Sequence, residues 1–128
     1  MGWWLSMIIN SKLLPKPVVL YSGSTTSTAT LSQTIANFKR IKVFGVNADN
    51  YGVYTEFYNN NSSTAKVILF SSAVGGYDAY QYSGSVDFNG ASVSLSRLSL
   101  TRIRNNNNSV VSANADAIKI TRIEGYTD

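Results

Sequence analysis

The residues best equipped for chemistry in this sequence are a serine and a lysine three positions apart, in the run Ser63-Thr64-Ala65-Lys66. A lysine at that spacing accompanies the nucleophilic serine of the penicillin-recognising enzymes, which also carry the motifs S-D-N and K-T-G. This chain has neither motif, and it contains no histidine and no cysteine to act as base or nucleophile. We therefore expect no catalytic residue and a protein that is not an enzyme.

Carboxylates offer a second route to chemistry, because a pair of them can hydrolyse a glycosidic bond. The chain has seven acidic residues, which lie singly along the sequence. Their pairing in space stays open at this point, although aspartates such as Asp49 and Asp78 are also common in turns. The oxygen-rich cluster of Asn47, Asp49 and Asn50 has a single charge and does not match the spacing of a calcium loop. We expect this cluster to be a turn, and we expect no metal and no cofactor.

Tyrosines interleaved with polar residues form the best candidate for a binding surface. Their rings can stack on the apolar faces of sugars, while neighbouring amides and carboxylates bond the sugar hydroxyls. The candidate glycan-binding residues are Tyr54, Tyr58, Tyr77, Asp78, Tyr80 and Tyr82. Tyrosine is also a favoured strand residue with one polar end, so a place in the core is the alternative for the same rings.

Strands must position these residues, because no segment has a convincing helical period. Residues 38–46 place Ile41 and Val43 on one face and Arg40 and Lys42 on the other, which predicts a half-buried strand. Residues 53–58 alternate in the same way, with Tyr54, Glu56 and Tyr58 sharing one face. Both faces of that segment are partly aromatic, so the sequence leaves open which one is buried.

Two further segments indicate how the strands connect. The apolar run of residues 65–71 is typical of a strand covered on both faces. Asn89-Gly90 is a strong hairpin signal and predicts that residues 86–88 pair with residues 93–95. The apolar phase slips after Val93, which indicates a β-bulge. We predict an all-β fold, a single antiparallel β-sandwich of jelly-roll type over residues 18–128.

An N-terminal arm is predicted over residues 1–17, because Pro15 and Pro17 favour an extended backbone and block a helix. The arm begins with an apolar stretch that is too short to span a bilayer. We expect it to serve docking or oligomerisation, with the contacts made by Trp3, Trp4, Leu5 and Ile8. Contact with a membrane surface is the alternative for the two tryptophans, and membrane insertion is not expected.

Charge is sparse in this chain. Only 14% of the residues are charged and the net charge is +4, so polarity is carried mainly by hydroxyl and amide groups. The eleven cations are spread along the chain, whereas binding a phosphate backbone needs several cations on one face. We therefore expect no nucleic-acid partner. A neutral polar surface suits contact with other copies of the protein or with sugar hydroxyls.

The two ends of the predicted domain resemble a β-domain of bacteriophage structural proteins, of the tail-fibre, baseplate or head-decoration type. The resemblance rests on residues 19–24 (VLYSGS), 28–32 (TATLS) and 35–43 (IANFKRIKV), and on residues 118–126 (IKITRIEGY). It implies a virion protein that forms a small homo-oligomer, with a trimer favoured, and that contacts other virion proteins. It provides no shared catalytic residues. A carbohydrate-binding module that recognises a cell-surface glycan of the host is the alternative function.

Overall fold

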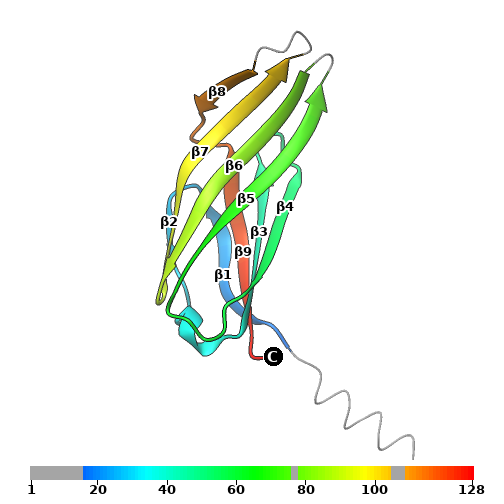
Figure 1. Ribbon diagram of the computed structural model, residues 1–128. Helices are drawn as coiled ribbons and strands as arrows, with labels where there is room; N and C mark the ends of the chain where they lie inside the picture. Colours follow the sequence, from blue (N-terminus) through cyan, green and yellow to red (C-terminus); the bar gives the residue numbers. More distant parts are fainter. Residues whose placement is uncertain (1–15, 76–77, 105–108) are drawn as a thin grey trace, which may run out of the picture.

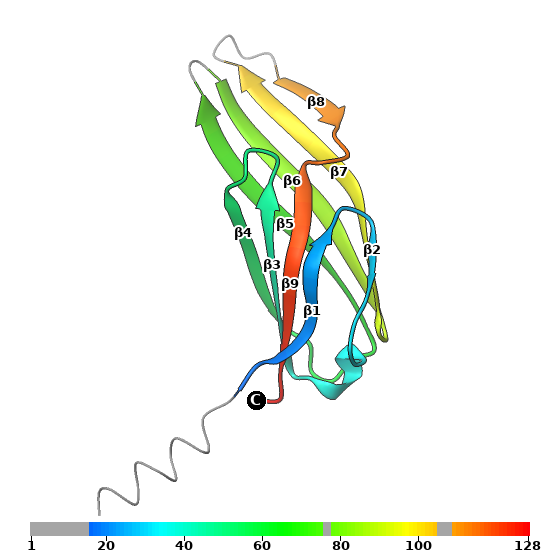
Figure 2. The same ribbon diagram turned by 180° about the vertical axis from the view of Figure 1, so that it is seen from behind.

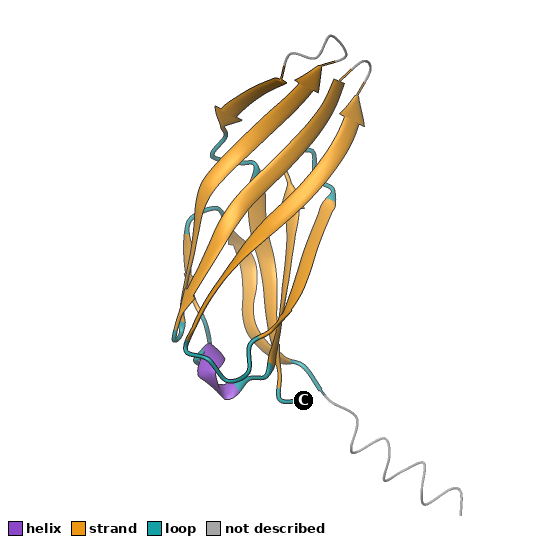
Figure 3. Ribbon diagram, in the orientation of Figure 1, coloured by secondary structure: helices purple, strands orange, loops and turns teal. Residues whose placement is uncertain are grey.

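The computed structural model describes residues 16–75, 78–104 and 109–128, which form two antiparallel β-sheets around one core (Figures 1 and 3). The four-stranded sheet has the order β1 (Val18–Thr25), β9 (Ile118–Tyr126), β3 (Arg40–Asn47) and β4 (Gly52–Tyr58). The five-stranded sheet has the order β2 (Thr28–Thr30), β7 (Ser92–Arg104), β6 (Asp78–Asn89) and β5 (Thr64–Gly75), and β8 (Ser109–Ala113) also pairs with β7. A 3-10 turn, Ile35–Asn37, precedes β3. The predicted all-β sandwich is confirmed.

The strand order wraps the two ends of the domain around the core. Strand β1 pairs with β9 in one sheet, and the next strand, β2, pairs with β7 in the other, which is the kind of wrapping found in jelly rolls. The middle of the domain is built from sequential neighbours, the β3–β4 hairpin and the β5–β6–β7 meander. The five-stranded sheet extends beyond the four-stranded one at the end away from the C-terminus (Figures 1 and 2). Part of its inner face is therefore not covered by the opposite sheet.

Alternation along the strands builds the core as the sequence predicts. Ile41 and Val43 of β3 are fully buried, while Arg40 and Lys42 point to the outer face of their sheet. In β4 the inward residues are Val53, Thr55 and Phe57, so Tyr54 and its alternate neighbours face outward. Burial of each such aliphatic side chain stabilises the fold by about 1.5–3 kcal/mol. The largest fully buried side chains include Phe38, Leu20, Ile35, Leu69, Ile118, Ile120 and Ile123.

The predicted hairpin and bulge are both present. Phe88 pairs with Val93 across the β6–β7 turn, as expected, but the turn residues are Gly90 and Ala91, one position later than the Asn-Gly signal suggests. Gly90 has a positive φ of 61°, a conformation that glycine adopts at little cost. The bulge lies where β7 carries one extra residue opposite Gly84 of β6, and Arg97 takes a positive φ there.

The prediction that residues 65–71 are covered on both faces is wrong. This segment belongs to β5, which lies at the edge of the five-stranded sheet and packs on the core through one face only. Leu69 is buried, whereas Ile68 and Phe70 on the outer face are 68% and 54% exposed. An apolar run shows that a strand is hydrophobic, but it carries no information on whether a second layer lies over its outer face.

Candidate functional site

The structure separates the candidate tyrosines into two groups on different sheets. Tyr54 and Tyr58 lie on the outer face of β4, whereas Tyr80 and Tyr82 lie on β6. Tyr77 is outside the described residues. Asp78 is the first residue of β6. The arm residues Trp3, Trp4, Leu5 and Ile8 also lie outside the described residues. A single platform made of all the candidate tyrosines is therefore not present.

Tyr82 is part of the sandwich interior. It is 5% exposed, and its hydroxyl donates a 2.7 Å hydrogen bond to Oδ2 of Asp49 in the β3–β4 turn. The hydrogen bond to Asp49 and the burial of the ring raise the pKa of Tyr82 to about 12, so the hydroxyl stays protonated at neutral pH. Asn47 makes a second tie between the sheets, because its Nδ2 donates to the Ser71 hydroxyl at 2.9 Å. Tyr82 holds the β3–β4 turn against the five-stranded sheet.

Tyr80 lies two residues earlier on β6, on the same face of the sheet as Tyr82. It is half-buried, and the Arg102 guanidinium lies 5.9 Å from the centre of its ring. Arg102 is directly opposite Tyr80 in the β6–β7 ladder. The ring is therefore already engaged by a neighbouring cation within its own sheet.

The exposed tyrosines among the candidates are on the four-stranded sheet. We call the outer side of this sheet around β4 the tyrosine face; it comprises Tyr54, Glu56 and Tyr58 of β4, Arg40, Lys42 and Phe44 of β3, and Tyr126 of β9. Tyr54 and Tyr58 are 52% and 67% exposed. They are four residues apart on one strand, which places their rings on one face roughly 13 Å apart. The Tyr54 ring packs against Phe44, with 5.1 Å between the ring centres.

Glu56 lies between the two tyrosines and is held from both sides. Arg40 donates to Glu56 at 2.6 Å, and the Tyr54 hydroxyl donates to the same carboxylate at 2.7 Å. The hydrogen bonds from Arg40 and then from Tyr54 lower the pKa of the Glu56 carboxyl group. Glu56 is therefore an ionised hydrogen-bond acceptor at neutral pH. Proton donation in glycoside hydrolysis needs the opposite, a carboxyl group whose pKa is raised.

Tyr126 completes the tyrosine face and was not among the residues that the sequence suggested. The Arg40 and Lys42 cations lie 4.4 and 4.7 Å from the centre of its ring. Its hydroxyl donates to Glu124, which also accepts a hydrogen bond from Arg122 at 2.7 Å. Alternation predicts that Arg40 and Lys42 face solvent. That they meet Tyr126 depends on the pairing of β3 with β9, for which the sequence contains no short-range signal.

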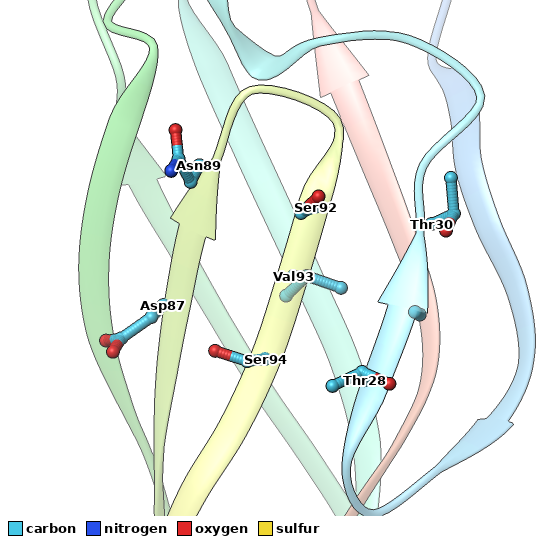
Figure 4. Close-up of a pocket in the computed structure, with 8 residues that line it drawn as sticks. Thr28, Thr30, Asp87, Asn89, Ser92, Val93 and Ser94 are labelled. Carbon is cyan, nitrogen blue, oxygen red and sulfur yellow. The ribbon is translucent and has the colours of Figure 1, made fainter.

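The outer face of the five-stranded sheet is rich in hydroxyl groups and carries a shallow hollow near β2 (Figure 4). The hollow has a volume of about 540 Å³ and is lined by Thr28, Ala29, Thr30, Asp87, Asn89, Ser92, Val93 and Ser94. Oδ1 of Asp87 is buried and makes no hydrogen bond among the described residues. In Figure 4 the Asp87 side chain points toward β5 and away from Thr28 and Thr30. The polar groups therefore do not converge on one point.

Large apolar side chains interrupt this hydroxyl-rich face. Ile68 and Phe70 of β5 stand beside Ser85 and Ser83 of β6, and the Ser83 hydroxyl is 2.8 Å from that of Ser99 on β7. Val111 of β8 is 69% exposed on the same face at the opposite edge. The face carries few charges, which are those of Lys66, Asp87 and Arg97, and it has exposed apolar groups near both of its edges.

Within the described part of the chain, no group of three or more histidine, cysteine, aspartate or glutamate residues is arranged to hold a metal ion. No helix within these same ranges is long and apolar enough to cross a membrane.

The fold and its surfaces define a small all-β sandwich with one aromatic and charged outer face and one outer face that is rich in hydroxyl and apolar groups and carries few charges. No protein-family model matches the sequence, and no curated protein matches it.

Proposed function

We propose that the protein is a non-enzymatic structural component of a bacteriophage virion, in the tail, baseplate or fibre. It assembles with copies of itself and with other virion proteins. The observation that carries the proposal is the outer face of the five-stranded sheet, where Ile68, Phe70 and Val111 are exposed among serines and threonines. The resemblance of the two ends of the domain to phage β-domains supports the virion location.

The physical reason is the composition of that face. Covering an exposed isoleucine or phenylalanine contributes about 1.5–3 kcal/mol per side chain. Hydroxyl groups lose less on leaving water than charges do, so a face with many hydroxyl groups and few charges can be covered at low cost. Such a surface suits a permanent contact with another protein better than it suits catalysis.

The test is the presence of the protein in purified particles of a phage that encodes it. We expect mass spectrometry to find the chain at a fixed ratio to the other virion proteins. Replacing Trp3 and Trp4 together with alanine should reduce its incorporation strongly, because the apolar arm is proposed to dock to the particle. Tyr51→Ala, which removes an exposed aromatic ring from the β3–β4 turn, is the matched control and should leave incorporation unchanged. Absence of the protein from intact particles would overturn the proposal.

A second candidate function is carbohydrate binding, and the tyrosine face supports it. Tyr54 and Tyr58 present exposed rings for stacking, and between them Glu56 is fixed as an acceptor for sugar hydroxyls. Lys42 and Arg40 supply donors close by. A virion protein that contacts a cell-surface glycan of the host would combine both functions.

Replacing Tyr54 and Tyr58 together with alanine should weaken binding to a host-surface glycan by about tenfold, since each stacked ring contributes about 0.5–1.5 kcal/mol. Binding is measured on a glycan array and then by titration calorimetry with the best oligosaccharide. Tyr58→Phe is the control, because it keeps the ring and should retain most of the affinity. Equal affinity of the double variant and the unmodified protein would remove the tyrosine face as the binding site.

A further inference from the structure

Strand β5 leaves one side of its backbone unpaired. It is the last strand in the order of the five-stranded sheet, and among the described residues its ladder partner is β6 alone. The β5–β6 register is continuous over all twelve residues of β5, without a bulge. Figure 1 shows β5 at the border of the sheet, with its upper part extending past the ends of β3 and β4. A row of N–H and C=O groups without a ladder partner among the described residues therefore lies along this border.

The side chains of β5 do not protect this edge. Edge strands in natural proteins usually carry charges, prolines or bulges that prevent another strand from adding. In β5 the single charged residue is Lys66, near its beginning, and residues 67–75 contain neither charge nor proline. Strand β4, at the edge of the other sheet, differs because it has Glu56 in the middle, bonded to Arg40. The β5 edge is therefore the more open of the two to strand addition.

The exposed apolar side chains of β5 flank one buried residue symmetrically. Ile68 and Phe70 point outward on either side of Leu69, which is buried in the core. If two β5 strands meet antiparallel with a twofold axis at Leu69, Ile68 of each copy lies opposite Phe70 of the other. Val67 then lies opposite Ser71, and Lys66 lies opposite Ser72, so no like charges meet. The strand is complementary to itself in this register.

We propose that β5 pairs with β5 of a second copy of this chain about a twofold axis at Leu69, so that the two five-stranded sheets become one continuous sheet. This inference rests on the self-assembly in the proposed function and specifies its contact. The pair gains backbone hydrogen bonds along the edge. It also gains a cluster of four large apolar side chains on the outer face, two from each copy.

Adding positive charge to the β5 edge provides the first test. Light scattering should give twice the chain mass for the unmodified protein over a wide range of concentrations. Replacing Ile68 and Phe70 together with lysine should raise the dissociation constant by more than about tenfold, because four like charges would then meet in the pair. Val111→Lys is the matched control, since Val111 has the same exposure as Ile68 and lies on the same face at the opposite edge. It should leave the mass at twice that of the chain.

The register is tested by cross-linking, which is clean because the chain has no cysteine of its own. Mixing the single variants Ile68→Cys and Phe70→Cys under mild oxidation should give a disulfide-linked pair more than about tenfold faster than either variant alone. In the mixture the two cysteines lie directly opposite each other in antiparallel strands, which is within disulfide reach. Circular dichroism of each variant confirms that the sandwich is folded.

Several results would overturn the pairing. In light scattering they are a monomer at every concentration, a trimer, or dissociation caused by Val111→Lys instead of by the double lysine variant of β5. In cross-linking the contradicting result is an equal rate for the mixture and for each single variant. A trimer or a contact through the outer face would still agree with the proposed self-assembly. Absence from virions would overturn the proposed function and would leave a twofold pair in solution intact, so the two failures are distinguishable.

Discussion

Replacing Phe38 with alanine is expected to lower the free energy of unfolding by about 3–5 kcal/mol, the usual cost of removing a buried phenylalanine. Phe38 follows the 3-10 turn, and its backbone N–H donates to the carbonyl of Ile35. Its side chain is buried beneath the strands and packs on Gly125 of β9. Without this ring, β9 would lose its packing contact with the loop that precedes β3. Urea unfolding followed by circular dichroism measures the change.

The fit between Phe38 and Gly125 provides an internal check. A Cβ atom added at Gly125 would lie 2.6 Å from Cγ of Phe38, which is too close for carbon atoms. Gly125→Ala alone should therefore lower the free energy of unfolding by about 1–3 kcal/mol. The same substitution should lower it less in a chain that also carries Phe38→Leu, where the smaller side chain makes room. Tyr51→Ala is the control, because substitution of an exposed turn residue should change stability by less than about 0.5 kcal/mol. Additive effects of the Gly125 and Phe38 variants would contradict the proposed contact.

Local patterns were sufficient to predict much of the fold. The alternation of Ile41 and Val43 with Arg40 and Lys42 indicated which side of β3 is buried, because strand side chains alternate between faces. Gly90 marked the β6–β7 hairpin, since few residues accept its backbone conformation. These signals depend on residues close together in the sequence, and the structure confirms them.

Features that depend on distant strands could not be predicted. The apolar character of residues 65–71 predicts two covered faces, but β5 lies at an edge, and strand order is a property of the whole sheet. The same limit applies to the binding surface. Period-two alternation places Tyr54 and Tyr58 together, but the pairing of β3 with β9 brings Tyr126 to them. Tyr82 is buried because the β3–β4 turn, which lies on the other sheet, packs on it through Asp49.

Asn59 is the buried residue that joins two loops at the base of the sandwich. Its side-chain nitrogen lies within hydrogen-bond distance of three backbone carbonyl oxygens, at 2.8 Å from Ile35, 3.1 Å from Phe38 and 2.9 Å from Ser62. Three acceptors around this atom require it to be the amide nitrogen. Oδ1 of Asn59 is buried without a hydrogen-bond partner in the described structure. The side chain therefore acts here through its donors.

Replacing Asn59 with aspartate keeps the shape of the side chain but removes these donors. At neutral pH it should lower the free energy of unfolding by about 3–5 kcal/mol, because a buried charge would face three carbonyl oxygens. Asn59→Ala, which removes the donors without adding charge, should cost only about 1–3 kcal/mol. Near about pH 3 the introduced carboxyl group is protonated and can donate once, so the cost should be smaller there. The folded variant binds this proton more tightly than the unfolded chain, and its stability relative to the unmodified protein therefore falls as pH rises. Urea unfolding of the three proteins at both pH values measures this difference. If Asn59→Asp lowers the free energy of unfolding at neutral pH no more than Asn59→Ala does, the amide donors do not hold the loops together.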